Sequence, residues 1–308
     1  MRKYVVPIVA LLGIALLTPQ SNAANLIIKS RAASAGTNVI LPVAATAIGG
    51  TTQLWGLDFT LNFDTTKVGV GTDPGGNGSA FSPFPVGTEV PVVVSGTTFV
   101  GTGATNPNLY VGIVRGTSPF VTTANAVGQP TSSIGLLRLT LAATGPVAGE
   151  VIDLAGPATY NVANTGDGST TNSRAGNTGA TSDATAGSAV VAEPVTVLAT
   201  MPVSGTVMSV PLHKIAVAPA GPGDVVAGGG IAVGDIAKLA NGLLGKSAMT
   251  DYNKIAGDVA PNGAGYVPHT NYGGTAGLSY GDGTISVGDV ALLAKMKLGT
   301  ATNAPVNE

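Results

Sequence analysis

The sequence Ile231-Ala-Val-Gly-Asp-Ile-Ala-Lys-Leu239 occurs a second time, slightly altered, as Ile285-Ser-Val-Gly-Asp-Val-Ala-Leu-Leu293. Each residue of the second copy lies 54 positions after its counterpart in the first. Upstream, Gly223-Asp-Val225 is repeated as Gly257-Asp-Val259 with an offset of only 34, so the second copy carries 20 additional residues between its two parts. The duplication predicts two similar local structures, each ending in a short helix.

Two aspartates in the first copy have the spacing of a cation-binding loop. Asp224 and Asp235 are the first and twelfth residues of a 12-residue segment that precedes an apolar helix. An EF-hand-like calcium loop needs this spacing, because its first and last carboxylates close on one ion. The alternative is that such aspartates are only turn and N-cap residues, a common role for Asp beside Gly.

The helices predicted after the two loops are short and have apolar residues three or four positions apart. Asp235 and Asp289 stand at their starts, where a carboxylate satisfies free backbone N–H groups, and both are predicted as N-caps. Two helices of this size bury little apolar surface, and a bound metal is a common way to stabilise so small a unit. The apolar positions are Ile236, Leu239, Ala240 and Leu243 in the first helix and Val290, Leu293, Ala294 and Leu298 in the second.

Composition narrows the class of protein. The chain has 308 residues, which suggests two domains, and its 45 Gly and 20 Pro indicate many short strands and turns. A net charge of −2 argues against nucleic-acid binding. The absence of cysteine excludes disulfides, thiolate zinc sites and cysteine nucleophiles.

The first 23 residues have the features of a secretory signal peptide. Arg2 and Lys3 supply the positive start, Tyr4–Leu17 is an apolar run of 14 residues, and Ser21-Asn-Ala23 offers a small-residue cleavage site. The alternative, a membrane helix, is disfavoured because the run is short for spanning a bilayer. We expect cleavage after Ala23, no membrane span in the mature chain, and an extracellular or cell-surface location.

Residues 24–198 alternate apolar and polar side chains, which is typical of half-buried strands. Trp55–Phe63 is the clearest case, and residues 39–43, 109–113 and 137–141 show the same period of two. Short strands separated by Gly, Pro, Asn and Asp predict an antiparallel β-sandwich of the jelly-roll kind, in a mostly β protein.

The remaining boundaries follow from composition. Asn161–Ser188 is almost entirely small and polar and is interpreted as a surface loop. Residues 199–219 are punctuated by proline and are predicted to be a linker, or a last strand plus linker. A small α-helical module with paired EF-hand-like loops then covers residues 220–300, and residues 301–308 form a tail.

The duplicated segment resembles the dockerin modules of cellulosomes, of type I, in which two calcium loops of the form GDVNGDG…D each precede an apolar helix and a Leu-Gly pair. Gly281-Asp-Gly-Thr-Ile-Ser-Val-Gly-Asp289 matches the second half of such a repeat, and Gly257-Asp-Val259 resembles its opening. The first copy keeps the loop length, but Val226 and Gly228 stand where the family has Asn or Asp. The resemblance covers about 80 residues.

The N-terminal part is similar to a cohesin, the β-sandwich partner of dockerins. The matching segments are Gly36-Thr-Asn-Val-Ile-Leu-Pro-Val43, Leu54-Trp-Gly-Leu-Asp-Phe-Thr-Leu-Asn-Phe-Asp64 and Gly135-Leu-Leu-Arg-Leu139. These are mostly packing positions, and carbohydrate-binding sandwiches have similar strands.

The two loops differ in the oxygen donors that they offer to Ca²⁺. The first provides Asp224, Asp235 and the carbonyl oxygen of Gly230, so whether it binds calcium is left open. The second provides more, and the extra 20 residues add only about 0.9 kcal/mol of loop-closure entropy. Its candidate ligands are Asp258, Asp282, Asp289, Ser286 and the carbonyl oxygen of Thr284.

The dockerin resemblance also implies a partner-binding surface. Val233-Gly234 and Val287-Gly288 occupy the pair before each closing aspartate, and in dockerins this pair and the following helix face the cohesin. Because both copies carry the same dipeptide, the resemblance implies a near-symmetric surface that docks in two directions. The alternative is that each Val packs inside while each Gly eases the loop into its helix.

Other potential sites have little support. His213 and His269 lack evident partners and are interpreted as solvated loop residues. Asp58 and Asp64 are interpreted as solvated strand and turn residues, because glycosidases need two carboxylates at a defined separation across a cleft. Trp55, the single tryptophan, lies on the apolar face of its strand and is predicted to be core rather than sugar-stacking.

We therefore expect a secreted, non-enzymatic scaffolding protein whose partners carry cohesins or dockerins, or are other copies of the chain joined head to tail. The alternative is a carbohydrate-binding or adhesive surface protein in which the C-terminal module is a tether, which leaves a polysaccharide partner open. The sequence does not identify the partner or any glycan, and it does not assign a role to Ala260–Tyr280.

Overall fold

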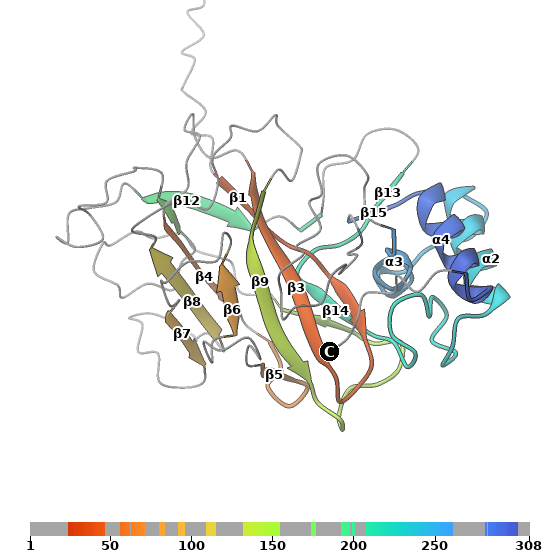
Figure 1. The fold of residues 1–308 in the computed structure, drawn as a ribbon, viewed down its shortest axis with the longest axis horizontal. Helices are drawn as coiled ribbons and strands as arrows, with labels where there is room; N and C mark the ends of the chain where they lie inside the picture. The colour runs from red at the N-terminus through yellow and green to blue at the C-terminus, as the bar shows by residue number, and fades with distance from the viewer. Residues whose placement is uncertain are drawn as a thin grey trace, which may run out of the picture.

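A computed structural model of the chain describes residues 24–46, 56–61, 63–71, 80–83, 92–95, 109–114, 132–154, 174–176, 192–197, 199–200, 207–260, 281 and 283–300. Within these residues the protein is mostly β, and its three helices gather at one side of the strands (Figure 1). None of the helices in these ranges is long and apolar enough to cross a membrane. The predicted signal peptide lies outside the described residues.

The largest sheet has ten strands. They are β1 (Ala24–Ile28), β3 (Asn38–Thr46), β4 (Gly56–Leu61), β5 (Val68–Val70), β6 (Phe81–Pro83), β7 (Val92–Ser95), β8 (Leu109–Val114), β9 (Ser132–Leu141), β11 (Arg174–Gly176) and β12 (Ala192–Val197). Their order is β5-β9-β3-β1-β12-β11-β4-β8-β7, and β6 pairs with β9. All pairs in this sheet are antiparallel except β1 with β12.

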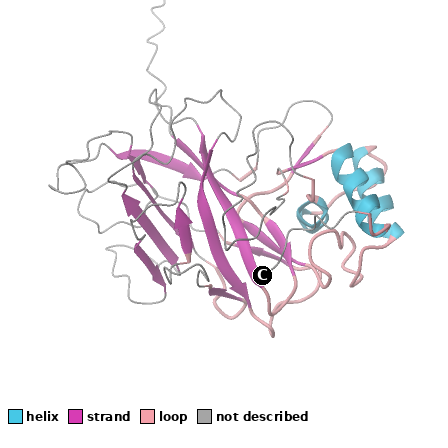
Figure 2. Ribbon diagram, viewed as in Figure 1, coloured by secondary structure: helices cyan, strands magenta, loops and turns pink. Residues whose placement is uncertain are grey.

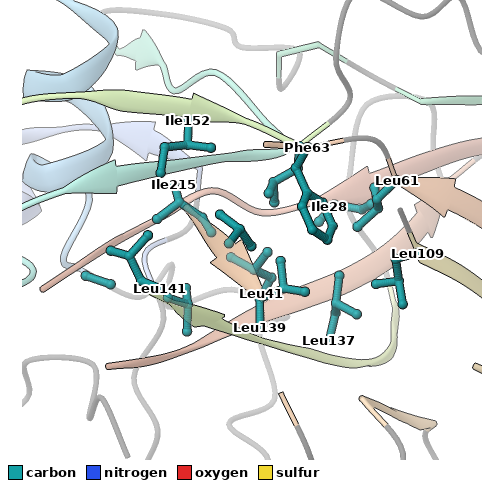
Figure 3. Packing of buried hydrophobic residues seen from close by; sticks show 14 of the residues in the cluster. Ile28, Leu41, Leu61, Phe63, Leu109, Leu137, Leu139, Leu141, Ile152 and Ile215 are labelled. Atoms are coloured by element: carbon teal, nitrogen blue, oxygen red, sulfur yellow. The ribbon is translucent and has the colours of Figure 1, made fainter. Parts of the chain in front are cut away.

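The apolar members of the period-two pattern form the core, as the sequence predicts. In β3, Val39, Leu41 and Val43 are buried, and in the neighbouring β9 the buried side chains are Leu137, Leu139 and Leu141. Side chains from the other end of the sheet, including Leu61 and Leu109, enter the same cluster (Figure 3). The two ends of the sheet thus enclose one core, which agrees with the mostly antiparallel sandwich expected from the sequence.

A smaller sheet divides this core from a second one. It has the order β10-β14-β2, with β10 (Val151–Asp153), β14 (Lys214–Val217) and β2 (Arg31–Ala33), and β14 runs parallel to β2. On one face Ile215 and Val217 belong to the sandwich core, whereas on the other Ala216, together with Ala32, belongs to the core beneath the helices. The small side chains on that second face let a helix approach closely.

The helices are α2 (Val233–Leu243), α3 (Asp251–Gly257) and α4 (Val287–Lys297). The sequence predicts α2 and α4 but not α3. At the start of α3, the Thr250 hydroxyl accepts a hydrogen bond from the Asn253 N–H, and the Asn253 side chain accepts one from the Thr250 N–H. This reciprocal cap makes a helix of only seven residues feasible, and α3 packs on β14 and β2.

Two strands lie within residues 199–219, the segment interpreted as a linker or a last strand plus linker. Lys214–Val217 forms β14, and β13 (Met208–Ser209) pairs antiparallel with β15 (Thr284–Ile285), which lies in the second loop. Among the described residues 207–219, the chain thus forms β13 and β14 before the helical part begins, and strands and loops lie beside the helices (Figure 2).

Candidate functional site

The closing aspartates of the two loops accept hydrogen bonds from equivalent backbone N–H groups. In the first, Asp235 accepts bonds from the N–H groups of Val226, at 2.8 Å, and Ala232, at 2.7 Å. In the second, Asp289 accepts bonds from the N–H groups of the equivalent residues, Ala260 and Ser286, both at 2.8 Å. The offsets of 34 and 54 in the sequence therefore correspond to one structural repeat.

The opening aspartates are also equivalent. Asp224 accepts a bond from the Gly229 N–H at 3.0 Å, and Asp258 accepts one from the Gly283 N–H at 2.9 Å. Gly229 and Gly283 have φ values of +83° and +89°, the left-handed conformation that the sharp turn of an EF-hand loop requires at its sixth position. In both segments the opening aspartate therefore bonds to the N–H of a glycine with positive φ.

The 20-residue insertion leaves the second loop closed. A Cβ atom at Gly281 would lie 2.5 Å from the Asp258 carboxylate, so the residues before and after the insertion are in direct contact. The Val259 N–H donates to Asp289 at 2.9 Å, which brings the first and last acidic residues of the loop together. Asp282 and residues 261–280 lie outside the described residues.

The closing aspartates are not the N-cap residues of the two helices, contrary to the prediction, but lie inside the first turn. Asp235 and Asp289 are the third residues of α2 and α4, and the N-caps are Ala232 and Ser286. Each carboxylate bonds to the backbone N–H of its own N-cap residue. The N-cap prediction was wrong by three residues, because the helices start two residues before the aspartates.

Helix α3 supports the first loop through two side-chain hydrogen bonds. The Tyr252 hydroxyl donates to the carbonyl oxygen of Asp224 at 2.6 Å, and the Asn253 amide donates to that of Val225 at 2.7 Å. Burial, followed by the charges of Asp224 and Asp235, raises the pKa of Tyr252, so its hydroxyl stays protonated as a donor. The sequence analysis missed both residues; the available signal was the capping pattern of Thr250 and Asn253.

The second loop is attached to the strands instead. The pairing of β13 with β15 joins Met208 to Ile285, and the Val210 N–H donates to the Gly283 carbonyl at 3.0 Å. From the sandwich, the buried Lys29 ammonium donates to the Gly281 carbonyl at 3.3 Å. The two similar loops therefore have different neighbours.

Calcium takes six to eight oxygen ligands, and the two loops differ in how well they meet this requirement. In the second loop Asp258 and Asp289 are buried, and the Ser286 hydroxyl donates to Asp289 at 3.1 Å. In the first loop Asp224 and Asp235 are fully buried, but Gly230 adds only its carbonyl. Among the described residues no three Asp, Glu, His or Cys side chains form a metal cluster.

Four exposed apolar side chains lie at equivalent positions at the starts and ends of α2 and α4. We call these residues the α2–α4 face: Val233 (70 % exposed), Leu244 (66 %), Val287 (76 %) and Leu298 (76 %). Gly234 and Gly288 lie beside the two valines and are exposed as well. Of the two interpretations of Val233 and Val287, packing inside is thus wrong, and exposure to solvent is what the structure shows.

The histidine that the structure describes is not solvated, contrary to the sequence interpretation. The His213 side chain is buried, its Nδ1 lies 3.2 Å from Asp153, and the backbone N–H of His213 donates to the Ile28 carbonyl at 2.7 Å. Asp64 is an exposed turn residue bonded to Thr66, as predicted. His269 and Trp55 lie outside the described residues, and the side chain of Asp58 is not described.

No protein-family model matches the chain, and no curated protein matches it. Among solved structures, it is similar to the sixth cohesin of scaffoldin B from Acetivibrio cellulolyticus, solved in complex with a dockerin, with 12 % identity over 63 % of this chain and 99 % of that one (TM-score 0.32). A cohesin from Clostridium thermocellum, also in a cohesin–dockerin complex, has 8 % identity over 63 % and 92 % (TM-score 0.33). A cohesin module of a Clostridium perfringens family 33 glycoside hydrolase has 10 % identity over 57 % and 91 % (TM-score 0.32). These values are too low to assign the chain to a family.

Proposed function

We propose that this chain is an extracellular, non-catalytic docking protein, and that its α2–α4 face binds a cohesin-type β-sheet on another molecule. The observation that carries the proposal is the repeated exposure of Val233 and Val287 at the helix starts and of Leu244 and Leu298 at the helix ends. Burying one such side chain contributes about 1.5–3 kcal/mol. A rigid surface with four of them has the apolar character of an interaction site.

The orientation of the helices supports a partner outside the chain. Helix α3 packs on β14 and β2, and α2 packs mainly against α4. In Figure 1, α2 and α4 lie on the side of α3 that faces away from the strands. The chain's own sandwich therefore leaves the α2–α4 face uncovered, which favours a second copy of the chain or another cohesin-bearing protein.

The repeat supports docking in two directions. Val233 and Leu244 in α2 correspond to Val287 and Leu298 in α4 at an offset of 54, so exchanging the two helices presents similar groups to the partner. Each orientation would rely on the same side-chain chemistry. Loss of one valine is then expected to weaken docking only partly.

Calcium is proposed for the second loop. Asp258, Asp282 and Asp289 would provide carboxylates, with Ser286 and the Thr284 carbonyl as further oxygen donors. When bound, the ion neutralises carboxylates and joins the two ends of the loop. The residues themselves fix the start of α4, since Asp289 bonds to the N–H of Ser286. Calcium would thereby hold Val287 in the docking surface.

Sedimentation velocity of the full chain, without its predicted signal peptide, tests the proposal. In calcium we expect concentration-dependent association, which excess chelator reverses. Val233→Asp together with Val287→Asp should abolish association, and either substitution alone should weaken it partly. Val147→Asp is the matched control, because Val147 is 64 % exposed but lies outside both loops and outside the α2–α4 face. A chain that stays monomeric in calcium would rule out docking between copies.

The rival function, a glycan-binding surface protein, would need exposed aromatic side chains that stack on sugars. Trp55, the single tryptophan, lies outside the described residues. It would gain support if the double aspartate variant left binding to insoluble polysaccharide unchanged while removing self-association.

A further inference from the structure

We infer that the first loop does not fit a calcium ion and that helix α3 closes it in place of a metal. The expectation of one calcium ion per chain, bound in the second loop, rests on the proposed function; the closure of the first loop by α3 does not. Tyr252 and Asn253 are the positioning residues in this assignment.

The oxygen donors of the first loop do not meet the demand of calcium. Its third, fifth and ninth positions are Val226, Gly228 and Ala232, none of which has a side-chain oxygen. Asp224, Asp235 and one carbonyl leave the loop well short of six to eight ligands. In the second loop the fifth and ninth positions are Asp282 and Ser286.

The carboxylates of the first loop already satisfy backbone groups inside the fold. Asp224 accepts hydrogen bonds from three N–H groups, those of Ala220, Gly228 and Gly229, at 2.7–3.1 Å. Asp235 accepts two more, at 2.7 and 2.8 Å. Charge-assisted bonds of this kind stabilise an ionised carboxylate in a buried position.

Helix α3 then holds the backbone of the loop at its beginning. Tyr252 and Asn253 donate to the carbonyl oxygens of Asp224 and Val225, the first two residues of the loop, and both bonds are buried. Val225 is itself fully buried in the core beneath the helices. Because α3 also packs on β14 and β2, these bonds attach the first loop to the body of the protein.

The helical part consequently has two halves with different requirements. The first loop and α2 are expected to keep their structure in chelator, because backbone N–H groups satisfy both of the loop's carboxylates. The second loop also has protein contacts, but without an ion its three acidic residues, Asp258, Asp282 and Asp289, are expected to repel one another, so its protection should fall in chelator. Chelation would then affect Val287 and Leu298 but leave Val233 and Leu244 in place.

Native mass spectrometry and hydrogen exchange of the full chain test this inference. We expect one calcium ion per chain. Asp224→Asn should leave that stoichiometry unchanged, whereas its equivalent in the second loop, Asp258→Asn, should lower the affinity at least tenfold. Hydrogen exchange of residues 224–235 should be the same in calcium and in chelator, and that of residues 283–289 should accelerate at least tenfold in chelator.

A gain-of-function variant adds a second test. Val226→Asn with Gly228→Asp restores side-chain oxygens at the third and fifth positions, and a Cβ at Gly228 has room, since its nearest neighbour is the Val226 side chain at 3.8 Å. We expect this variant to bind two calcium ions. Tyr252→Phe should accelerate exchange of the first loop in calcium and in chelator alike, without changing the calcium count.

The outcomes separate the inference from the proposed function. Two ions bound to the unmodified chain, or first-loop protection that appears only with calcium, would overturn the inference and leave the docking function standing. No bound calcium, with the first loop still protected, would support its metal-free closure and refute calcium dependence of docking. Unchanged first-loop exchange in Tyr252→Phe and in Asn253→Ala would overturn the role assigned to α3.

Discussion

The first and second loops have one backbone framework but different supports. Asp235 and Asp289 accept bonds from equivalent N–H groups, and each loop turns at a glycine with positive φ. Yet the first loop is attached to α3 through Tyr252, whereas the second is attached to the sandwich through β13 and Lys29. A repeated sequence thus fixes local geometry, while the surroundings of each copy decide what else holds it in place.

Truncation of the equivalent buried leucines is expected to have the largest effect. Leu239 and Leu293 are both fully buried, so Leu239→Ala and Leu293→Ala should each lower the free energy of unfolding by about 2–5 kcal/mol. Because both side chains enter the same core, the two losses should be similar, as urea denaturation of the full chain would show.

The exposed leucines provide the control for this pair. Leu244→Ala and Leu298→Ala should change the free energy of unfolding by less than about 0.5 kcal/mol. If Leu239→Ala lowered the free energy of unfolding much more than Leu293→Ala in calcium, α2 and α4 would not contribute equally to the core. The two repeats would then differ in packing as well as in their neighbours.

The equivalent glycines before the opening aspartates should respond differently to substitution. A Cβ at Gly223 would lie 2.9 Å from both Ile231 and Leu293, and its φ of +96° strains any L residue. A Cβ at Gly257 would also be crowded, 2.6 Å from a methyl group of the buried Leu239, but Gly257 is helical and does not have a positive φ. Gly223→Ala should therefore destabilise the protein by about 1–2 kcal/mol more than Gly257→Ala. Equal losses in thermal or urea unfolding would contradict this difference.

The smallest expected effect comes from an ion pair that belongs to neither loop. Lys67 contacts Glu150 and is the main cause that lowers the pKa of Glu150 below 4.5. A carboxylate with a lowered pKa adds stability above its ordinary pKa, and that contribution is lost as the pH falls through the folded-state value. Glu150→Gln should thus lower the free energy of unfolding at neutral pH. In acid, the free energies of unfolding of the variant and the unmodified chain should converge.

This variant also sharpens the comparison of the loops. Acid unfolding monitored by hydrogen exchange should change near Lys67 and Glu150, while the exchange of residues 224–235 and 283–289 stays as in the unmodified chain at neutral pH. A change in either loop would mean that the sandwich edge and the loops are coupled.

Much of the fold follows from local patterns in the sequence. The period-two segments of β3 and β9 place Leu41 and Leu139 in the core, because alternate side chains of a strand face the same side. The repeats predict α2 and α4. The spacing of Asp224 and Asp235 predicts that they lie at the two ends of one loop. Helix α3 was missed because its seven residues are too few for a clear periodicity, and only Thr250 and Asn253 indicate its start.

Strand β14 shows why the boundary between the two parts escaped prediction. Ile215 and Val217 enter the sandwich core while Ala216 enters the core beneath the helices, so both faces are buried and no polar alternation remains to identify a half-buried strand. His213 was interpreted as solvated because the sequence shows no evident partner for it, although tertiary contacts bury it beside Asp153.

The sequence by itself determined the strand pattern, the two helices and the spacing of the acidic residues, because each depends on contacts between residues close in the chain. Only the tertiary structure decided that α3 supports the first loop, that strands support the second, and that Val233 and Val287 point into solvent. These outcomes depend on groups far apart in the sequence, such as Lys29 and Gly281, which no local pattern relates.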